Sequence, residues 1–175
     1  MGASEAEPGA AARLSHLADG PRGLESRMVD VGSKPVSARA ALARARVRFP
    51  AGLLPAVLEG DGPKGPIREV ARAAGLLAAK RTGELIPMCH PLGLDHLEIG
   101  FETAGEDLLE IRCRAACTGR TGVEMEAMTG AAVAALTVYD MTKGMDHGIR
   151  IESVELLEKR GGRSGHWRAA GHEAS

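Results

Sequence analysis

An aspartate and a lysine stand three residues apart near the end of a long segment rich in Ala and Met. Asp140 and Lys143 would lie on one face of a helix, because residues three apart are neighbours on a helical surface. A carboxylate beside an ammonium can act as an acid and base couple, and the ammonium can also hold a phosphate. The same spacing is typical of a surface ion pair without a chemical role, so other residues must decide between the two interpretations.

Acidic residues also open this segment. Glu124 and Glu126 flank Met125, and Glu126 precedes Asp140 by 14 positions. On one helix this separation is about 21 Å at 1.5 Å per residue. If both ends are functional, either the substrate is long or the second group comes from another subunit. The alternative is that acidic residues simply favour the positive end of the helix dipole, which explains Glu124 better than Glu126.

A histidine is held between two prolines in the segment Met88-Cys89-His90, which Pro87 and Pro91 enclose. Proline restricts its own backbone and that of the residue before it, so the direction of this loop is fixed. A histidine presented in this way can bind a base edge or a phosphate, or shuttle a proton. An ordinary turn histidine remains an equally good interpretation.

The chain has three cysteines, Cys89, Cys113 and Cys117. A zinc site is disfavoured, because Cys113 and Cys117 stand four apart in an expected strand and no second tight Cys or His pair is present. Buried reduced thiols explain them better. An odd number of cysteines also suits a reducing cytoplasm rather than a disulfide framework.

Basic residues are spread along the chain and do not form one cluster. Lys64 precedes an expected helix start, a position that favours anions, and Arg163 stands in a Gly-Gly-Arg-Ser-Gly loop whose N–H groups can line a phosphate. Taken singly, each basic residue is also explained as a solvated surface charge. The candidates are Arg39, Lys64, Lys80, Lys143, Lys159 and Arg163.

The pattern of apolar residues predicts the elements that carry these groups. Alternation from 39 to 49 predicts a strand with a row of arginines on one face, although Ala and Arg also favour helices. Thr121 is expected to cap the last helix, with Glu124 completing a capping box. The order of elements predicts an α+β, ferredoxin-like fold (split βαβ) in which helices cover one face of an antiparallel sheet. The expected elements are a strand at 39–49, helices at 53–58 and 66–81, strands at 97–101 and 109–115, a helix at 122–143 and a strand at 149–159 with a bulge near Glu152 and Ser153.

The 175 residues suffice for one domain. We expect a loose N-terminal tail at 1–26, a single catalytic domain at 27–167 and a flexible C-terminal tail at 168–175. The many small side chains and the 2% aromatic content favour a homo-oligomer, since a lone chain would have a thin core. A net charge of −1 argues against a nucleic-acid or membrane partner, and no secretory signal is seen, so a cytoplasmic location is expected.

Several segments together resemble one family, the cyclic pyranopterin monophosphate synthases (molybdenum cofactor biosynthesis protein C). They occur in the order of the family and span about 28 to 167. Single segments would be weak evidence, but the set is specific. The matching segments are MVDV at 28–31, AAKRT at 78–82, LIPMCHPL at 85–92, TGRTGVEMEA at 118–127 and ALTVYDMTK at 135–143.

The resemblance implies a homohexamer, a trimer of dimers, with active sites at dimer interfaces. It implies a pyrophosphate-releasing, cyclising lyase that acts on 3′,8-cyclo-7,8-dihydro-GTP, a GTP derivative, in molybdenum cofactor (molybdopterin) biosynthesis. No cofactor is required, although Mg²⁺ could accompany the triphosphate. Asp140 and Lys143 match the catalytic pair. The substrate-binding positions are Arg39, Lys64, Lys80, Met88, Cys89, His90, Glu124, Met125, Glu126 and Lys159.

The chain departs from the family pattern at three positions. Pro66 stands where Asp is usual, which affects how Lys64 is presented, whereas Thr142 for Cys and Arg163 for Lys keep the character of their sites. Two other classes of function were weighed. A regulatory ligand-binding module would make the Asp140 and Lys143 pair structural. An RNA-binding sheet needs exposed aromatic residues, and the expected strands offer only Phe49 and Phe101, both facing the core.

Overall fold

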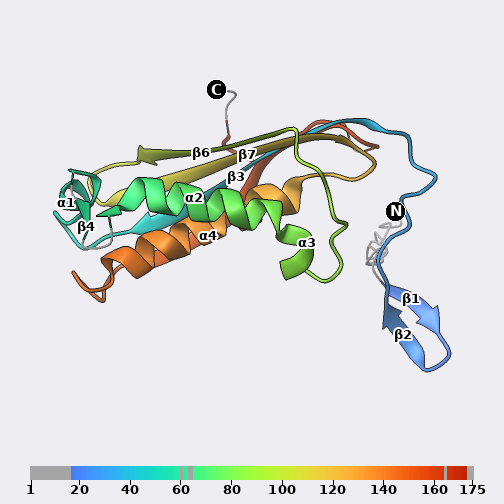
Figure 1. The fold of residues 1–175 in the computed structure, drawn as a ribbon, viewed down its shortest axis with the longest axis horizontal. Helices are drawn as coiled ribbons and strands as arrows, with labels where there is room; N and C mark the ends of the chain where they lie inside the picture. The colour runs from blue at the N-terminus through green and yellow to red at the C-terminus, as the bar shows by residue number, and fades with distance from the viewer. Residues whose placement is uncertain (1–16, 60, 63–64, 164, 173–175) are drawn as a thin grey trace, which may run out of the picture.

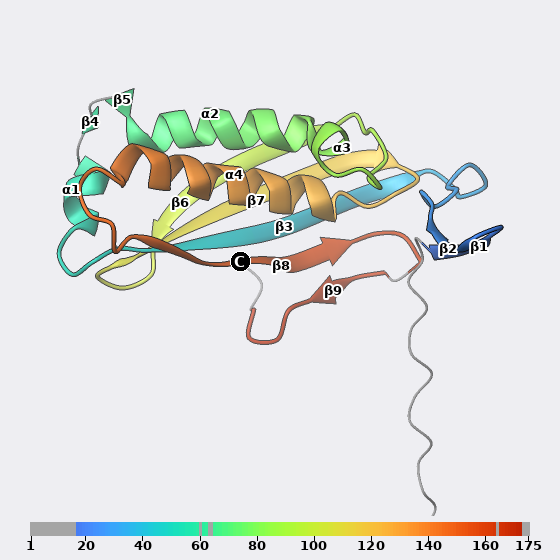
Figure 2. The ribbon, with the colours of Figure 1, turned by 90° about the horizontal axis from the view of Figure 1, so that it is seen from below.

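A computed structural model describes residues 17–59, 61–62, 65–163 and 165–172. Within these residues a five-stranded antiparallel sheet has the order β6-β7-β3-β8-β9, and α2 and α4 cover one of its faces (Figures 1 and 2). The bounds are β1 Leu17–Gly20, β2 Gly23–Ser26, β3 Ser37–Arg48, α1 Leu54–Glu59, β4 Asp61–Gly62, β5 Gly65–Pro66, α2 Ile67–Lys80, α3 Thr82–Leu85, β6 His96–Thr103, β7 Leu108–Gly119, α4 Glu124–Thr142, β8 Arg150–Arg160 and β9 Trp167–Arg168.

The central elements follow one another as β3, α2, β6, β7, α4 and β8, and the four long strands lie in the order β6-β7-β3-β8. This is the split βαβ arrangement, in which each helix returns the chain across the same face of the sheet. The predicted α+β ferredoxin-like fold is therefore confirmed. The strand predicted at 39–49 is β3, and the helix predicted at 122–143 is α4.

Small side chains form the contact between the helices and the sheet. Ala43 and Ala45 of β3 are fully buried, as are Ala131 and Ala135 of α4. The two helices also approach each other closely, because a Cβ atom on Gly75 of α2 would lie 2.7 Å from the carbonyl oxygen of Gly130. Such close packing leaves few voids, so the positions of α2 and α4 on the sheet are tightly constrained.

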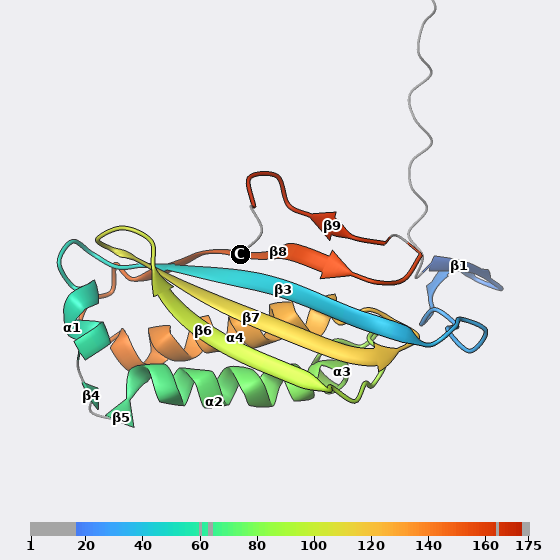
Figure 3. The same cartoon turned by 90° about the horizontal axis from the view of Figure 1, so that it is seen from above.

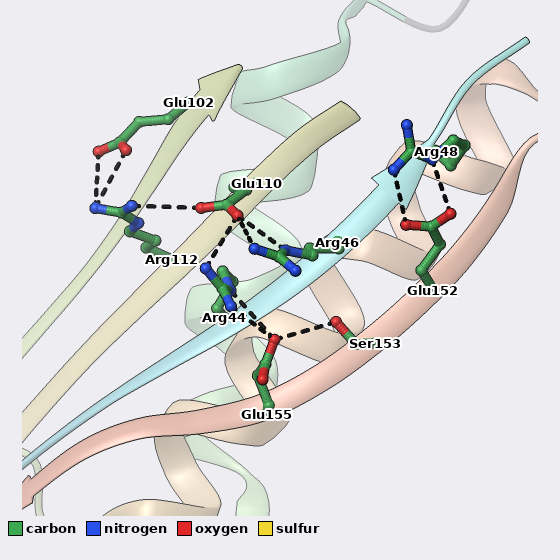
Figure 4. A network of polar contacts seen from close by, with 9 residues as sticks. All are labelled: Arg44, Arg46, Arg48, Glu102, Glu110, Arg112, Glu152, Ser153 and Glu155. Atoms are coloured by element: carbon green, nitrogen blue, oxygen red, sulfur yellow. Dashed lines mark hydrogen bonds and ion pairs between the residues drawn. The ribbon is translucent and has the colours of Figure 1, made fainter. Parts of the chain in front are cut away.

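The opposite face of the sheet carries a network of charges instead of helices (Figure 4). Glu110 of β7 is only 4% exposed and accepts hydrogen bonds from Arg44 at 3.0 Å and from Arg46 at 2.9 Å. Arg112 reaches its second oxygen at 3.3 Å. Burial opposes ionisation of Glu110, but these guanidinium groups outweigh it and hold the pKa of the carboxyl below its ordinary value. The predicted arginine row is confirmed, and Glu110 neutralises it together with Glu152 and Glu155.

Strand β8 departs twice from regular pairing with β3. Arg46 and Val47 pair with Ser153 and Ile151, so Glu152 is an extra residue on β8. Leu42 and Ala43 pair with Glu158 and Leu156, so Leu157 is a second extra residue. Each extra residue is a bulge that exchanges the faces of the residues beyond it. The first bulge confirms the irregularity predicted near Glu152. The second, at Leu157, was not predicted.

The ends of the described chain differ from the sequence predictions. Residues 17–26, expected to belong to a loose tail, form the hairpin β1–β2, which projects from the body of the protein (Figure 3). At the other end, β9 continues through Arg168 and the amide of Ala169 donates to the carbonyl of Leu157 at 2.9 Å, so 168–172 is not simply a tail. Among the described residues, no helix is long and apolar enough to cross a bilayer.

The predicted capping box at the start of α4 does not form. Val123 occupies the N-cap position, and no side chain caps the first turn. Thr121 instead lines the cleft described below. The pattern of Thr121 and Glu124 thus correctly indicated a helix start but not the capping bonds, and both residues line the cleft.

Glu110→Gln is expected to lower the free energy of unfolding by about 2 kcal/mol at pH 7, since three arginines lose their shared carboxylate. The pKa of Glu110 is lower in the folded state than in the unfolded state. The carboxylate therefore contributes fully to the free energy of unfolding above the unfolded-state pKa, and this contribution is lost as pH falls through the folded-state pKa. The difference between variant and wild type should therefore shrink in acid. Urea unfolding between pH 3 and 8 measures it, with the exposed Glu106→Gln as control; a difference that grows in acid would contradict this role.

Candidate functional site

A cleft of about 500 Å³ lies at the end of the molecule where α4 begins. Its walls come from the segment before β3, from the proline-bounded loop after α3, and from the first turn of α4 with the residues before it. Apolar side chains line much of the cleft, and acidic, basic and imidazole groups stand among them. The lining residues are Val29, Val31, Lys34, Ile86, Met88, Cys89, His90, Leu92, Thr121, Gly122, Glu124, Met125 and Glu126.

His90 fastens the segment before β3 to the loop after α3. Its Nε2 lies 2.7 Å from the carbonyl oxygen of Val29. A carbonyl oxygen only accepts, so Nε2 carries a proton and donates, which leaves Nδ1 to face its surroundings. The loop itself is tightened by a hydrogen bond from the amide of Cys89 to the carbonyl of Ile86 at 3.0 Å. The stiff presentation expected from the two prolines is thus provided by hydrogen bonds as well.

Glu126 is the buried acidic group of the cleft. It is 4% exposed, and among the described residues no cation forms an ion pair with it. Burial raises the pKa of the Glu126 carboxyl, with a further contribution from the nearby charge of Glu124. A carboxyl that burial makes harder to ionise, placed in a cleft, is typical of functional sites.

Lys159 reaches the cleft from β8, with its Nζ 3.5 Å from Oε1 of Glu124. Lys80, at the end of α2, lines a smaller adjoining cavity of about 190 Å³ whose wall includes Glu126. Arg39 of β3 donates to the carbonyl oxygens of Gly119 at 3.4 Å and of Arg120 at 3.5 Å, next to the loop that enters α4. The structure therefore places three predicted basic residues around this end of the molecule.

Burial makes the cysteine thiols of the described chain harder to ionise. Burial raises the pKa of the Cys89 thiol, and the charge of Glu126 adds to the effect. Burial also raises the pKa of Cys113 to about 12. Both thiols are thus protonated at neutral pH, whereas nucleophilic attack and metal binding need the thiolate. Across the described part of the chain, no group of three or more His, Cys, Asp or Glu side chains is arranged to hold a metal ion.

Asp140 and Lys143 lie at the end of α4, whereas the residues of the cleft belong to its start. Figures 1 and 2 show the length of the helix between these two ends. Their side chains form an ion pair of 2.7 Å and are 49% and 54% exposed. The hydrogen bond to Asp140 and the carboxylate charge raise the pKa of Lys143. The ammonium therefore stays protonated at neutral pH, which is the form that holds phosphate and has a proton to give.

Lys64 lies outside the described residues. The short strands on either side of it in the sequence, β4 and β5, lie at the end of the molecule where α4 ends (Figures 1 and 2). Within one chain, the described candidates thus separate into two groups. One group surrounds the cleft at the start of α4, and the other, Asp140 with Lys143, stands at the end of that helix.

Lys34 is a basic residue of the cleft that the sequence analysis missed. It lies in the irregular segment before β3 and has no periodic pattern around it that would predict its position. The carbonyl oxygen of Lys34 accepts a hydrogen bond from Arg120 at 3.2 Å, which ties this segment to the loop before α4. The only available signal was its place shortly after the MVDV segment at 28–31.

The MoaC family model matches residues 28–162, a range that contains the cleft and the whole of α4. The chain belongs to the MoaC family. Three similar proteins are each named cyclic pyranopterin monophosphate synthase. That of Thermomicrobium roseum is 52% identical over 93% of this chain and 97% of its own length. That of Chloroflexus aggregans is 51% identical over 89% and 93%, and that of Xanthomonas axonopodis pv. citri is 54% identical over 87% and 92%.

Replacing Glu126 by Gln tests its place in the cleft. Because the folded-state pKa of Glu126 is raised, ionising this carboxyl costs more free energy in the folded state than in the unfolded state. Its contribution to stability is complete below the unfolded pKa and is lost as pH rises through the folded pKa. Glu126→Gln should therefore be more stable than wild type at pH 8, and the gain should vanish near pH 4. Thermal unfolding at both pH values measures this, with the exposed Glu59→Gln as control. A loss of stability at pH 8 would contradict a carboxyl whose ionisation is disfavoured by burial.

Proposed function

We propose that this chain converts 3′,8-cyclo-7,8-dihydro-GTP into cyclic pyranopterin monophosphate with release of pyrophosphate, in molybdenum cofactor biosynthesis. The observation that carries the proposal is the cleft itself. It is lined by the proline-bounded Met88-Cys89-His90 loop and by the Glu124-Met125-Glu126 turn, and it lies wholly within the range that matches the MoaC family. The names of the relatives give the product, cyclic pyranopterin monophosphate, and the substrate is the one that the family resemblance implies.

The character of the cleft suits a purine nucleotide. Apolar walls from residues such as Val29, Ile86 and Leu92 can cover the faces of a ring system. Glu126 and Nδ1 of His90 offer hydrogen-bonding groups for the edge of a base. Lysines and arginines around the cleft can neutralise the triphosphate and stabilise the departing pyrophosphate.

The reaction needs proton transfers as well as charge stabilisation. In the final closure, a hydroxyl oxygen of the substrate attacks the α-phosphorus and the bond to the β-phosphate breaks. Pyrophosphate then leaves with the bonding electrons, and the hydroxyl proton must pass to a base. We assign the proton transfers to Asp140 and Lys143, which already share a hydrogen bond of 2.7 Å.

These two residues can reach the cleft only from a second copy of the chain. The distance along α4 between Glu126 and Asp140 is about 21 Å, too long for one small substrate. Val133 lies midway between them, and the exposed side of α4 near it is apolar, with Leu136 56% exposed. We propose that two chains pair α4 against α4 in antiparallel fashion about a two-fold axis near Val133. Such an isologous contact brings the partner subunit's Asp140 to the level of Glu126.

The proposed assembly is a homohexamer formed as a trimer of such dimers, in the cytoplasm. No resident cofactor is assigned to the chain. Mg²⁺ can arrive with the triphosphate, because it commonly binds phosphate oxygens together with few protein ligands. Repeating the assay below with EDTA tests for such a contribution.

Asp140→Asn is expected to reduce turnover at least about 100-fold, the usual contribution of a positioned acid or base. The measurement is an anaerobic assay with 3′,8-cyclo-7,8-dihydro-GTP that follows both pyrophosphate and the pterin product. Asp146→Asn is the matched control, since it is an exposed aspartate just beyond α4 whose amide keeps an acceptor for Gly148. Wild-type protein that releases no pyrophosphate would remove the proposed function. An active Asp140→Asn protein would instead leave Asp140 as a structural residue.

Mixing Asp140→Asn subunits with Glu126→Gln subunits, each first shown to be inactive alone, tests whether the site is shared. Asp140→Asn subunits contribute an intact cleft, and Glu126→Gln subunits contribute an intact helix end. If sites form across a two-fold axis, an equal mixture reassembled from dissociated chains should regain about one quarter of wild-type activity, because half of the dimers are mixed and each has one complete site. No recovery, with native mass spectrometry showing that mixed oligomers formed, would contradict the shared site.

A further inference from the structure

A buried glutamate on β8 gathers three basic side chains around the last hairpin of the chain. Glu158 is 9% exposed, and its Oε1 accepts a hydrogen bond from Nε of Arg160. The same oxygen lies 2.7 Å from Nε2 of His166 and 3.7 Å from Nη2 of Arg168. Burial opposes ionisation of this carboxyl, but the bonds from Arg160 and His166 outweigh it, so its pKa lies below the ordinary value.

These contacts join two strands that share only a short stretch of pairing. Strand β9 has two residues, and it pairs with β8 through Glu158 with Arg168 and through Lys159 with Trp167 (Figure 3). A two-residue strand at the edge of a sheet has little stability of its own, because few ladder hydrogen bonds hold it. The carboxylate of Glu158 therefore provides a large part of what keeps β9 against β8.

The residue next to Glu158 is Lys159, which forms an ion pair with Glu124 of the cleft. Glu158 pairs with Leu42 on the open face of the sheet, whereas Lys159 pairs with Ala41, whose side chain faces the helices. This difference of face lets Lys159 reach Glu124 at 3.5 Å while Glu158 stays on the opposite side. Lys159 thus lies between Glu158 and the first residues of the following turn, and its backbone is held by both β3 and β9.

The turn after β8 also lies close to a basic residue of the site. Gly161 and Gly162 both have positive φ, and a Cβ atom on Gly162 would overlap the guanidinium of Arg39. The turn can lie this close only because both positions are glycine. A displacement of β9 would therefore disturb Lys159 and the environment of Arg39 together.

We propose that Glu158 is a positioning residue that, by holding β9 to β8 through Arg160, His166 and Arg168, sets the places of Lys159 and Arg39 for the phosphates of the substrate. It touches neither the substrate nor the cleft, so it acts on binding and leaves the proton transfers to other residues. The activity readout rests on the proposed function, whereas the structural and binding readouts do not.

The test compares Glu158→Gln with Glu155→Gln. Glu155 lies on the same strand and the same face, but it binds Arg44 at 2.9 Å and makes no contact with β9, so it is a matched control for loss of a sheet-face carboxylate. Glu158→Gln is expected to raise KM about tenfold and to leave kcat within about twofold, the pattern of lost binding rather than lost chemistry. Arg168→Gln, which leaves Arg160 and His166 on the carboxylate, should raise KM about threefold and serves if the first variant folds poorly.

Two further measurements do not require turnover. Pyrophosphate binding by calorimetry should weaken about tenfold in Glu158→Gln and not in Glu155→Gln, in line with the change in KM. Hydrogen exchange at the amide of Ala169, which bonds to the carbonyl of Leu157, should be faster only in Glu158→Gln. Equal effects of the two glutamate variants on KM, pyrophosphate affinity and exchange would overturn the proposal. Wild type that binds pyrophosphate but forms no pterin would contradict the proposed function alone.

Discussion

The distance between the helices and the sheet is the constraint on which the rest of the structure depends. Alanines of β3 meet alanines of α4, and two glycines allow α2 and α4 to approach each other closely. Because these contacts involve backbone and Cβ atoms, they permit little adjustment by rotation of side chains. The start of α4, and with it Glu126, is therefore fixed relative to the loop that carries His90. A rigid base of this kind is what a site needs when its groups must meet a substrate in one geometry.

In the proposed function, one chain alone is incomplete as an enzyme. Helix α4 carries Glu126 near its start and Asp140 near its end, 14 residues apart. The exposed apolar side of α4 offers a surface that another chain can cover, so assembly and catalysis are linked in the proposed function. A chain with so few large side chains also gains a greater share of its buried surface from such a contact.

Local periodicity was sufficient to predict most of the fold. Alternation in 39–49 distinguished a strand from the helix that its Ala and Arg content favours, and the order of elements then led to the split βαβ arrangement. The loop at His90 and the turn at Glu126 were predicted as site residues from the family resemblance, and the structure brings them into one cleft. Lys34 was missed because its segment has no periodicity. The hairpin at 17–26 was missed because four-residue strands with mixed polarity resemble a loop.

The bulge at Leu157 has a consequence for how this strand can vary in length. With one extra residue relative to β3, the strand turns Lys159 toward the helices, although regular alternation would have placed it beside Glu155 on the open face. A deletion of one residue here would exchange the faces of Glu158 and Lys159, leaving an ammonium among arginines and a carboxylate beside Glu124. Between this bulge and the end of β8, only insertions or deletions of an even number of residues keep Lys159 facing the helices. The number of residues in this part of β8 is therefore constrained by the site.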